Sequence, residues 1–359
     1  MSVFSCKYFF SFLKKYVFFR SNLIRMTQNY SKILIIQTAF IGDAILATAV
    51  LEKLKSYYPN AEYSFLVRKG NETLLKNHPF LHQVLVWDKT QSKYGNFLKL
   101  LKHIRQNKFD LLINLHRFAS SGLLMALSNA REKICFDKNP FSFLANKKLP
   151  HILEKGVHEI DRNQSLIAHI TDSEPARPRL YPNSEDIESI TNLLETEYIC
   201  IAPASVWQTK QVPSHKWVEL IRALPKGKKV YLLGAKSDFG LCQEILEATK
   251  GQALVHNLSG KIGLLASAAL MQKAKMNYVN DSAPLHLASA MNAPVCAVYC
   301  STSPDFGFYP TSDYAKVVET SQTLSCRPCG LHGYKKCPKG HFACGESIQI
   351  ETLIEQLPQ

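Results

Sequence analysis

Short apolar runs alternate with helical patterns along the chain from residue 32 onward. The runs in the first half are residues 33–36, 63–67, 84–87, 111–115 and 134–136, and the helical stretches between them are residues 44–57, 71–76, 94–106 and 120–127. Runs that are apolar at every position indicate strands buried on both faces. Helices between such strands predict a parallel sheet that is covered on both sides.

The alternation pauses once and then restarts. Residues 173–186 carry three prolines among several charged residues, which is typical of a linker. After it, strands are predicted at residues 198–202, 230–233, 276–280 and 295–299, and helices at residues 216–223, 238–248, 263–273 and 285–290. We therefore expect an extension at residues 1–30, an α/β domain at 31–175, a linker at 176–190 and a second α/β domain at 191–359.

Both domains are predicted to be doubly wound, or Rossmann-like, and to face each other across a cleft. Ligands of such folds bind outside the carboxyl ends of the parallel strands. This bilobal arrangement is compatible with the GT-B type of glycosyltransferase. It is equally compatible with periplasmic-type binding proteins, so the architecture alone indicates no function.

Composition narrows the possible classes. Of the 359 residues, 46% are apolar and 20% charged, which is enough to build cores and excludes a disordered chain. The net charge of +14 indicates phosphorylated ligands, nucleic acid or an anionic membrane surface as partners. Nucleic acid is not expected, because the basic residues are scattered and no known nucleic-acid-binding module is present. No apolar run approaches the roughly 18 to 20 residues of a membrane-spanning helix.

The first 30 residues combine basic and aromatic side chains and contain no acidic residue. Basic residues interrupt the apolar stretch too often for a secretory signal. Two interpretations stay open: an amphipathic helix that lies on an anionic membrane face, or an upstream extension of a chain that begins at Met26.

The first strand–helix turn places Gly42 and Asp43 at the predicted cleft. Gly42 permits a close approach to the backbone and is expected to contact the acceptor. Asp43 is a favoured residue for a helix cap, which by itself accounts for its position. The functional interpretation is a general base that accepts a proton from an acceptor hydroxyl. Capping and catalysis are compatible, and the helix N-terminus is expected to lower the pKa of the Asp43 carboxyl.

Two further polar turns follow predicted strands of the second domain. In residues 202–210, Ser205 and Thr209 offer hydroxyls and Lys210 a positive charge, a set that suits a diphosphate, although an exposed polar loop has a similar composition. In residues 280–286, Ser282 and the backbone N–H groups of a helix start are candidates for holding phosphate oxygens. His286 lies in the first turn of that helix, where a packed histidine is the plainer interpretation.

Gly234 marks another strand end at which a nucleotide is expected to approach the backbone. Its surroundings lack the G-x-G-x-x-G spacing, so NAD is not predicted.

Four cysteines cluster near the C-terminus. Cys326 and Cys329 form a Cys-x-x-Cys pair, and Cys337 and Cys344 follow at a wider spacing. Such a set is a candidate structural zinc site. The alternative is a group of packed free thiols, since ten cysteines in so long a chain do not indicate a disulfide scaffold.

Several stretches resemble glycosyltransferase family 9, the ADP-heptose:lipopolysaccharide heptosyltransferases. They are residues 33–47 (ILIIQTAFIGDAILA), 202–213 (APASVWQTKQVP), 258–264 (LSGKIGL) and 280–288 (NDSAPLHLA). The tail at residues 325–344 (SCRPCGLHGYKKCPKGHFAC) is similar to a segment of the heptosyltransferase II branch. The resemblance runs from about residue 32 to the C-terminus.

The resemblance implies a GT-B fold, with the acceptor lipid saccharide on the first lobe and ADP-heptose on the second. It implies transfer by inversion without a catalytic metal, with Asp43 as general base. Donor contacts are implied for Ser205, Lys210, Asp281, Ser282 and His286. Arg117, together with the basic stretch 133–148, is a candidate for holding acceptor phosphates, although a solvated basic face accounts equally well for that stretch.

Two positions depart from the family pattern. Family members commonly have glycine where this chain has Ala204 and Ala283, at points where the backbone should approach the donor phosphates. The acidic residue that contacts ribose in some members also has no clear counterpart after Gly234, where Lys236 and Asp238 stand. The identity of the donor is therefore less sharply indicated than the class of reaction.

Together, charge and resemblance predict a monomeric, cytoplasmic enzyme at the inner face of the inner membrane. It is expected to use an ADP-sugar donor and a phosphorylated lipid-linked saccharide acceptor. A transferase of the same fold with another nucleotide sugar is one alternative. A sugar-nucleotide-binding protein without activity is another, although it would not need Asp43.

Overall fold

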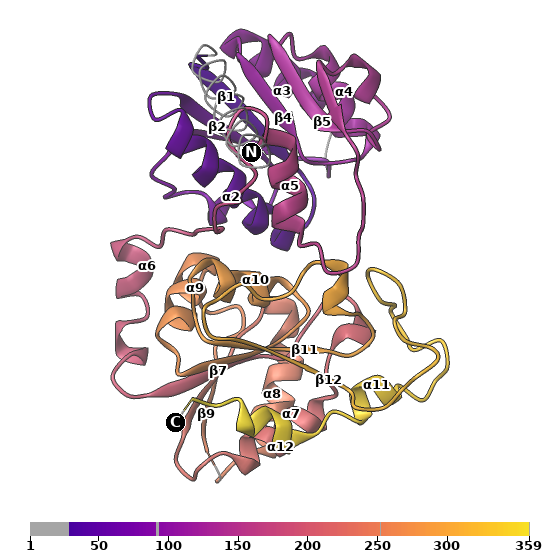
Figure 1. Ribbon diagram of the computed structural model, residues 1–359. Coiled ribbons are helices and arrows are strands. Elements are labelled where there is room, and N and C mark those ends of the chain that lie inside the picture. The colour runs from indigo at the N-terminus through magenta and orange to yellow at the C-terminus, as the bar shows by residue number, and fades with distance from the viewer. Residues whose placement is uncertain (1–28, 91–92, 252, 359) are drawn as a thin grey trace, which may run out of the picture.

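The computed structural model describes residues 29–90, 93–251 and 253–358, and Figure 1 shows them as two lobes, one above the other. Nearly all of the predicted extension lies outside the described residues. Tyr30 was placed in that extension, but its side chain is buried in the core of the first lobe. Its hydroxyl donates a hydrogen bond to Glu132 Oε2 at 2.6 Å, and its ring packs edge-on against Tyr58. The first lobe therefore begins before residue 31.

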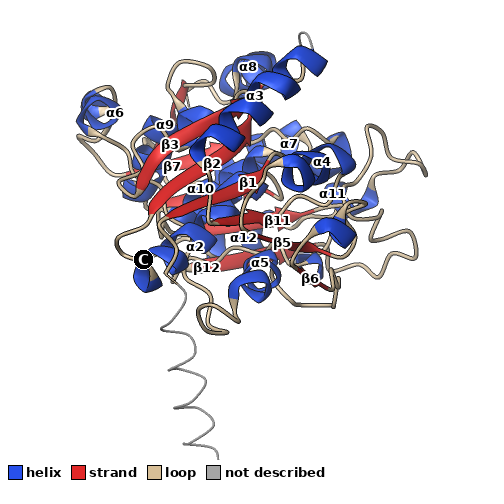
Figure 2. Cartoon of the chain, turned by 90° about the horizontal axis from the view of Figure 1, so that it is seen from above, coloured by secondary structure: helices blue, strands red, loops and turns tan. Residues whose placement is uncertain are grey.

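The first lobe is built on a six-stranded parallel sheet. Its strands are β1 (Lys32–Gln37), β2 (Glu62–Arg68), β3 (Leu81–Trp87), β4 (Leu111–Asn114), β5 (Glu132–Phe136) and β6 (Lys147–Leu149). They lie in the order β3-β2-β1-β4-β5-β6, and Figure 2 shows them fanned across the lobe. The chain leaves β1 toward one edge and returns at β4 toward the other. The carboxyl ends of β1 and β4 therefore flank the crevice where such folds bind ligands.

Burial of β1 on both faces explains its uninterrupted apolar sequence. Ile33 and Ile35 pack on the face covered by α2 (Ile41–Tyr57) and α5 (Glu159–Ile167). Leu34 and Ile36 pack on the opposite face, which is covered by α3 (Lys93–Asn107) and α4 (Ala119–Leu127). All four side chains are fully buried.

The second lobe repeats this plan. Its strands are β7 (Tyr198–Ala202), β8 (Lys229–Leu232), β9 (Leu254–Asn257), β10 (Met276–Asn280), β11 (Val295–Tyr299) and β12 (Ala315–Glu319). They are parallel, in the order β12-β11-β10-β7-β8-β9. The helices are α7 (Ser214–Ala223), α8 (Phe239–Ala248), α9 (Leu264–Lys273), α10 (Ala283–Ala290), α11 (Ala343–Glu346) and α12 (Ile350–Glu355). The predicted fold of two doubly wound parallel sheets is confirmed.

Two segments differ from the predicted elements. Residues 71–76, predicted as a helix, form only the 3₁₀ turn Glu72–Leu74. The predicted linker contains a short helix, α6 (Ser184–Glu188). This helix is held by a capping box, in which the Asn183 side chain accepts from Asp186 N at 2.9 Å and the Asp186 carboxylate accepts from Asn183 N at 3.0 Å.

The lobes are joined by helix packing and by a strap. Helix α10 of the second lobe packs against α2 of the first. The strap, residues 155–162, reaches from the first lobe to the loop at residues 305–309 of the second. Along it, Gly156 N donates to Asp305 O at 2.9 Å and Glu159 N donates to Gly307 O at 2.8 Å. Within the part of the chain that the structure describes, no helix is both long and apolar enough to cross a membrane.

Candidate active site

Asp43 lies at the crevice beside the carboxyl end of β1. Helix α2 has Phe40 as its N-cap, so Asp43 is the third helical residue and its half-buried carboxylate accepts from the backbone N–H groups of Phe40 and of Asp43 itself. Burial raises the pKa of Asp43 to about 6, although these N–H groups and the cations Arg117 and Lys210 lower it. The N–H groups at the helix N-terminus lower this pKa as expected, but the loss of hydration outweighs them, so the expected net decrease is wrong.

Gly42 lies at a close contact between the two lobes. A Cβ atom added to Gly42 would lie 2.7 Å from Cδ2 of His286 in α10. We had expected Gly42 to admit an acceptor; the structure places a protein side chain there. His286 is buried, its Nδ1 has no hydrogen-bond partner among the described residues, and burial lowers its pKa to about 3. It is therefore a neutral residue of the lobe interface.

Lys210 and Asp281 follow β7 and β10, the two strands that flank the crevice of the second lobe. Lys210 Nζ lies 2.7 Å from Asp281 Oδ2, and both side chains are largely buried. Asp281 Oδ2 also accepts from Thr302 Oγ1 at 2.7 Å. Lys210 acts electrostatically on Asp43, and so does Arg117, which follows β4. The structure thus brings Arg117, Asp43 and Lys210 together from both lobes.

Asn280 joins the two predicted phosphate-binding turns. It is fully buried at the end of β10, where its Nδ2 donates to Pro203 O at 2.8 Å and its Oδ1 accepts from Val212 N at 2.9 Å. The hydroxyl of Ser282, the N-cap of α10, donates to Ala204 O at 3.4 Å. Ser205 and Ala283 lie half-buried beside these contacts. One buried amide therefore fixes the distance between the turns.

Thr209 has a different role from the one predicted. Its side chain is buried, and its hydroxyl contacts Ser301 Oγ at 3.0 Å and Tyr334 N at 2.7 Å. This hydroxyl is committed to the protein, so we retain Ser205 but not Thr209 in the donor site that we propose below. Gly234 follows β8, and its carbonyl accepts from Gly260 N at 2.9 Å.

Sequence reasoning missed a buried charged group in the strap. Arg162 Nε donates to Glu159 Oε2 at 2.8 Å, and Arg162 Nη2 donates to Phe306 O of the second lobe at 3.1 Å. Burial raises the pKa of Glu159 to about 7, and the nearby Asp43 carboxylate adds to this increase. Next to it, His158 Nε2 donates to Tyr309 O at 3.0 Å. No apolar periodicity marks these residues in the sequence, and only the folded chain brings them near Asp43.

The tail cysteines lie close enough together to affect the pKa of two of them, Cys329 and Cys344. Burial and the thiols of Cys326 and Cys337 raise the pKa of Cys329, and burial, reinforced by the other three, raises that of Cys344 to about 11. Within the described ranges, however, no three His, Cys, Asp or Glu side chains are gathered so as to hold a metal ion. The zinc site stays a prediction.

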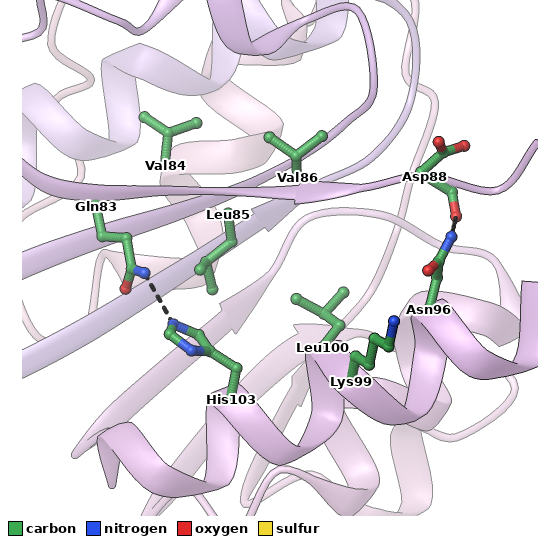
Figure 3. A pocket seen from close by; sticks show the side chains of 9 residues that line it. All are labelled: Gln83, Val84, Leu85, Val86, Asp88, Asn96, Lys99, Leu100 and His103. Carbon is green, nitrogen blue, oxygen red and sulfur yellow. Dashed lines mark hydrogen bonds between the residues drawn. The ribbon is translucent and has the colours of Figure 1, made fainter. Parts of the chain in front are cut away.

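A hollow elsewhere on the first lobe is unrelated to this cleft. It lies between β3, the edge strand of the sheet, and α3, as Figure 3 shows. Gln83 Nε2 and His103 Nε2 are hydrogen-bonded to each other across it at 2.8 Å. Its polar groups are thus paired within the protein, and we assign it no chemistry.

The arrangement in the cleft suits transfer of a group from a phosphorylated donor. A carboxylate with a pKa near 6 is ionised at neutral pH and is a stronger base than an ordinary aspartate. Opposite it, Lys210 and the turns after β7 and β10 offer cationic and N–H groups for a departing phosphate.

Comparison with known proteins identifies relatives along most of the chain. Residues 97–335 match glycosyltransferase family 9 (heptosyltransferase), which is more than half of the chain. Lipopolysaccharide heptosyltransferase 2 of Escherichia coli K12 is 26% identical over 91% of this chain and 95% of its own length. Lipooligosaccharide heptosyltransferase 2 of Campylobacter jejuni is 23% identical over 91% and 98%.

Solved structures show the same fold. The E. coli ADP-heptose LPS heptosyltransferase II has a TM-score of 0.75 at 22% identity, covering 91% of this chain and 97% of that one. A family 9 glycosyl transferase from Veillonella parvula has a TM-score of 0.78 at 21% identity, covering 92% and 96%.

Proposed function

Because the chain belongs to glycosyltransferase family 9 and is therefore a glycosyltransferase, we propose that it transfers a heptose from ADP-heptose to the lipopolysaccharide inner core. The main structural support for this proposal is the position of Asp43. Its carboxylate belongs to the acceptor lobe, and its pKa is nevertheless lowered by Lys210 of the donor lobe. The base and the leaving-group site are thus on opposite sides of one reaction centre.

The proposed step is a single displacement with inversion. The acceptor hydroxyl oxygen attacks the anomeric carbon while its proton passes to Asp43. The bond between that carbon and the phosphate oxygen breaks, and ADP departs with the electron pair. Lys210 stabilises the negative charge that grows on the phosphate, aided by Ser205, by Ser282 and by backbone N–H groups at the start of α10. No metal ion takes part in this step.

Support for the donor comes from relatives. The E. coli heptosyltransferase WaaC, solved with ADP-2-deoxy-2-fluoro heptose, has a TM-score of 0.69 at 18% identity over 90% of this chain and 99% of that one. Ala204 and Ala283 add methyl groups at the two phosphate-binding turns, both half-buried. A different nucleotide sugar is therefore the second candidate, which retains the reaction class and the same base.

The acceptor is expected to enter from the first lobe, where Arg117 lies beside Asp43. A phosphorylated, lipid-linked saccharide accords with the net charge of +14. We propose that the enzyme works in the cytoplasm against the anionic inner face of the inner membrane, where basic proteins are attracted electrostatically.

The test is ADP release from wild type and from Asp43→Asn, with ADP-heptose and other nucleotide sugars offered in turn. Loss of a general base should lower kcat by roughly 10²- to 10⁴-fold. Asp110→Asn is the matched control, since Asp110 directly precedes β4, at the amino ends of the strands and therefore opposite the cleft, where it pairs with Arg131 at 3.5 Å. Equal turnover by Asp43→Asn and wild type would show that Asp43 is not the general base. If only another nucleotide sugar were turned over, ADP-heptose would be wrong as the donor, but the reaction class of glycosyl transfer would stand.

A further inference from the structure

The cysteine-rich tail lies directly on the donor lobe's phosphate-binding turn. Tyr334 N donates to Thr209 Oγ1 at 2.7 Å, and Thr209 N donates to Tyr334 O at 3.1 Å. Cys329 N donates to Ser301 O at 2.7 Å, just beyond the carboxyl end of β11. These backbone contacts fix the tail residues between Cys329 and Tyr334 next to Lys210.

Arg327 anchors the start of this segment. Its guanidinium donates to Cys300 O at 2.6 Å and to Thr302 O at 2.7 Å, and it pairs with Glu319. Thr302 also holds Asp281, the partner of Lys210. The same short loop therefore supports the tail and the charged pair of the proposed donor site.

Gly333 shows how tightly the tail is seated. Its φ is +72°, and a Cβ atom there would lie 2.7 Å from Thr209 Oγ1 and 3.3 Å from Lys210 Cγ. Glycine is therefore needed at this position, both because φ is positive and because there is no room for a Cβ atom. The backbone next to His332 therefore packs closely against the aliphatic part of the Lys210 side chain.

His332 faces charged groups from both lobes. Partial burial lowers its pKa, and Lys210 and Arg117 lower it further, while Asp281 opposes them. The exposed His332 thus lies beside Lys210, and Arg117 of the first lobe acts on it electrostatically. A lowered pKa leaves the imidazole neutral at pH 7, with one N–H to donate.

We propose that His332, together with Arg117 and Lys210, binds a phosphate group in the cleft, so that the tail is a third part of the active site. This inference rests on the proposed function. Two cations and an N–H donor from three separate segments converge on one region, and a phosphate offers the acceptor oxygens and negative charge that such a set binds. The phosphate comes either from the donor diphosphate or from the acceptor, and the two sources predict different kinetics.

The experiment compares wild type with His332→Ala and His332→Gln, and with His256→Ala as control. His256 lies exposed on the edge strand β9 of the same lobe, outside the cleft. ADP binding is measured by calorimetry without acceptor, and KM is measured for donor and acceptor. Unfolding midpoints equal to wild type establish that the tail variants fold, and Gln, which keeps an N–H donor, should restore part of any loss.

For a donor phosphate, His332→Ala should raise the Kd of ADP and the KM of the donor about tenfold and leave the acceptor KM unchanged. For an acceptor phosphate, the acceptor KM alone should rise. Wild-type values for all three constants would overturn the inference. The calorimetric arm needs no turnover, so weaker ADP binding by His332→Ala would stand even if no sugar were transferred and the proposed function failed.

Discussion

His286 of the second lobe lies against Gly42 of the first, so closely that any Cβ atom at position 42 would come within 2.7 Å of the imidazole. The imidazole has little room to move, because it is buried and also packs edge-on against Phe308, with ring centroids 6.2 Å apart. Asp43 is the next residue along α2. The spacing of the lobes beside Asp43, the proposed general base, therefore depends on a contact between a glycine and a histidine.

Gly42→Ala should push the lobes apart at this point. We expect kcat/KM to fall at least tenfold and the free energy of unfolding to fall by about 1–3 kcal/mol, as for other overpacked sites. Gly240→Ala is the control: Gly240 lies in α8 with nothing within 4 Å of an added Cβ, so activity should stay and stability should rise slightly. Steady-state kinetics and urea unfolding measure both, and a Gly42→Ala enzyme as active as wild type would exclude this role.

Asp43→Asn should stabilise the protein while it abolishes transfer. The folded-state pKa of Asp43 is raised from 3.8 to about 6, so ionisation of this group opposes folding. A shift of about two pKa units corresponds to roughly 3 kcal/mol. The advantage of Asn should be near zero below pH 4, where Asp43 is protonated in both states, and should be complete above about pH 6. Urea unfolding of both proteins at pH 4 and pH 7.5 measures it; an advantage that does not grow with pH would contradict the assigned pKa.

The pH dependence of transfer should report the charges around Asp43. The base must be ionised, so kcat should fall as the pH drops through about 6. Lys210 lowers this pKa, and Lys210→Met should therefore move the acid limb of the profile to higher pH, besides weakening donor binding. His256→Ala should leave the limb in place. A limb that stayed fixed or moved to lower pH in the Lys210 variant would mean that Lys210 does not act on the base.

The four tail cysteines give a prediction about metal content. If they form a zinc site, purified protein should carry close to one zinc per chain by elemental analysis, and Cys326→Ser with Cys329→Ser should lose it. Cys242→Ala, which removes a buried thiol of α8 that is not one of the four tail cysteines, should keep the zinc. Protein purified without chelators that carries almost no zinc would show that these are packed free thiols.

Strands buried on both faces were the most predictable part of the fold. The bounds of β7, β10 and β11 match the predicted ranges because every residue in them is buried, so the apolar run and the strand coincide. The edge strands β9 and β12 alternate irregularly between exposed and buried positions and were missed. Helix α5 was missed for another reason. Its buried face includes the charged residues Glu159 and Arg162, so the sequence lacks the regular apolar spacing that predicts a helix.

The site was predictable where it follows a strand end and unpredictable where it depends on how the lobes pack. Asp43, Lys210 and Asp281 were found because parallel strands bring their carboxyl ends to one edge. The closeness of Gly42 to His286, and of Glu159 to Asp43, arises between segments that lie far apart in the sequence. His332 was not predicted as a site residue, since nothing in its sequence surroundings places it beside Lys210.

Asp43 and Lys210 belong to different lobes, and this separation bears on the fate of the activated sugar. In the proposed mechanism, a nucleotide sugar bound to the second lobe alone lacks the general base, because Asp43 belongs to the first lobe. Water that reaches the sugar in that state is not deprotonated, so hydrolysis gains no help from the enzyme. On this proposal the base reaches the donor only where the two lobes meet, so the activated sugar is transferred to the acceptor and is protected from hydrolysis.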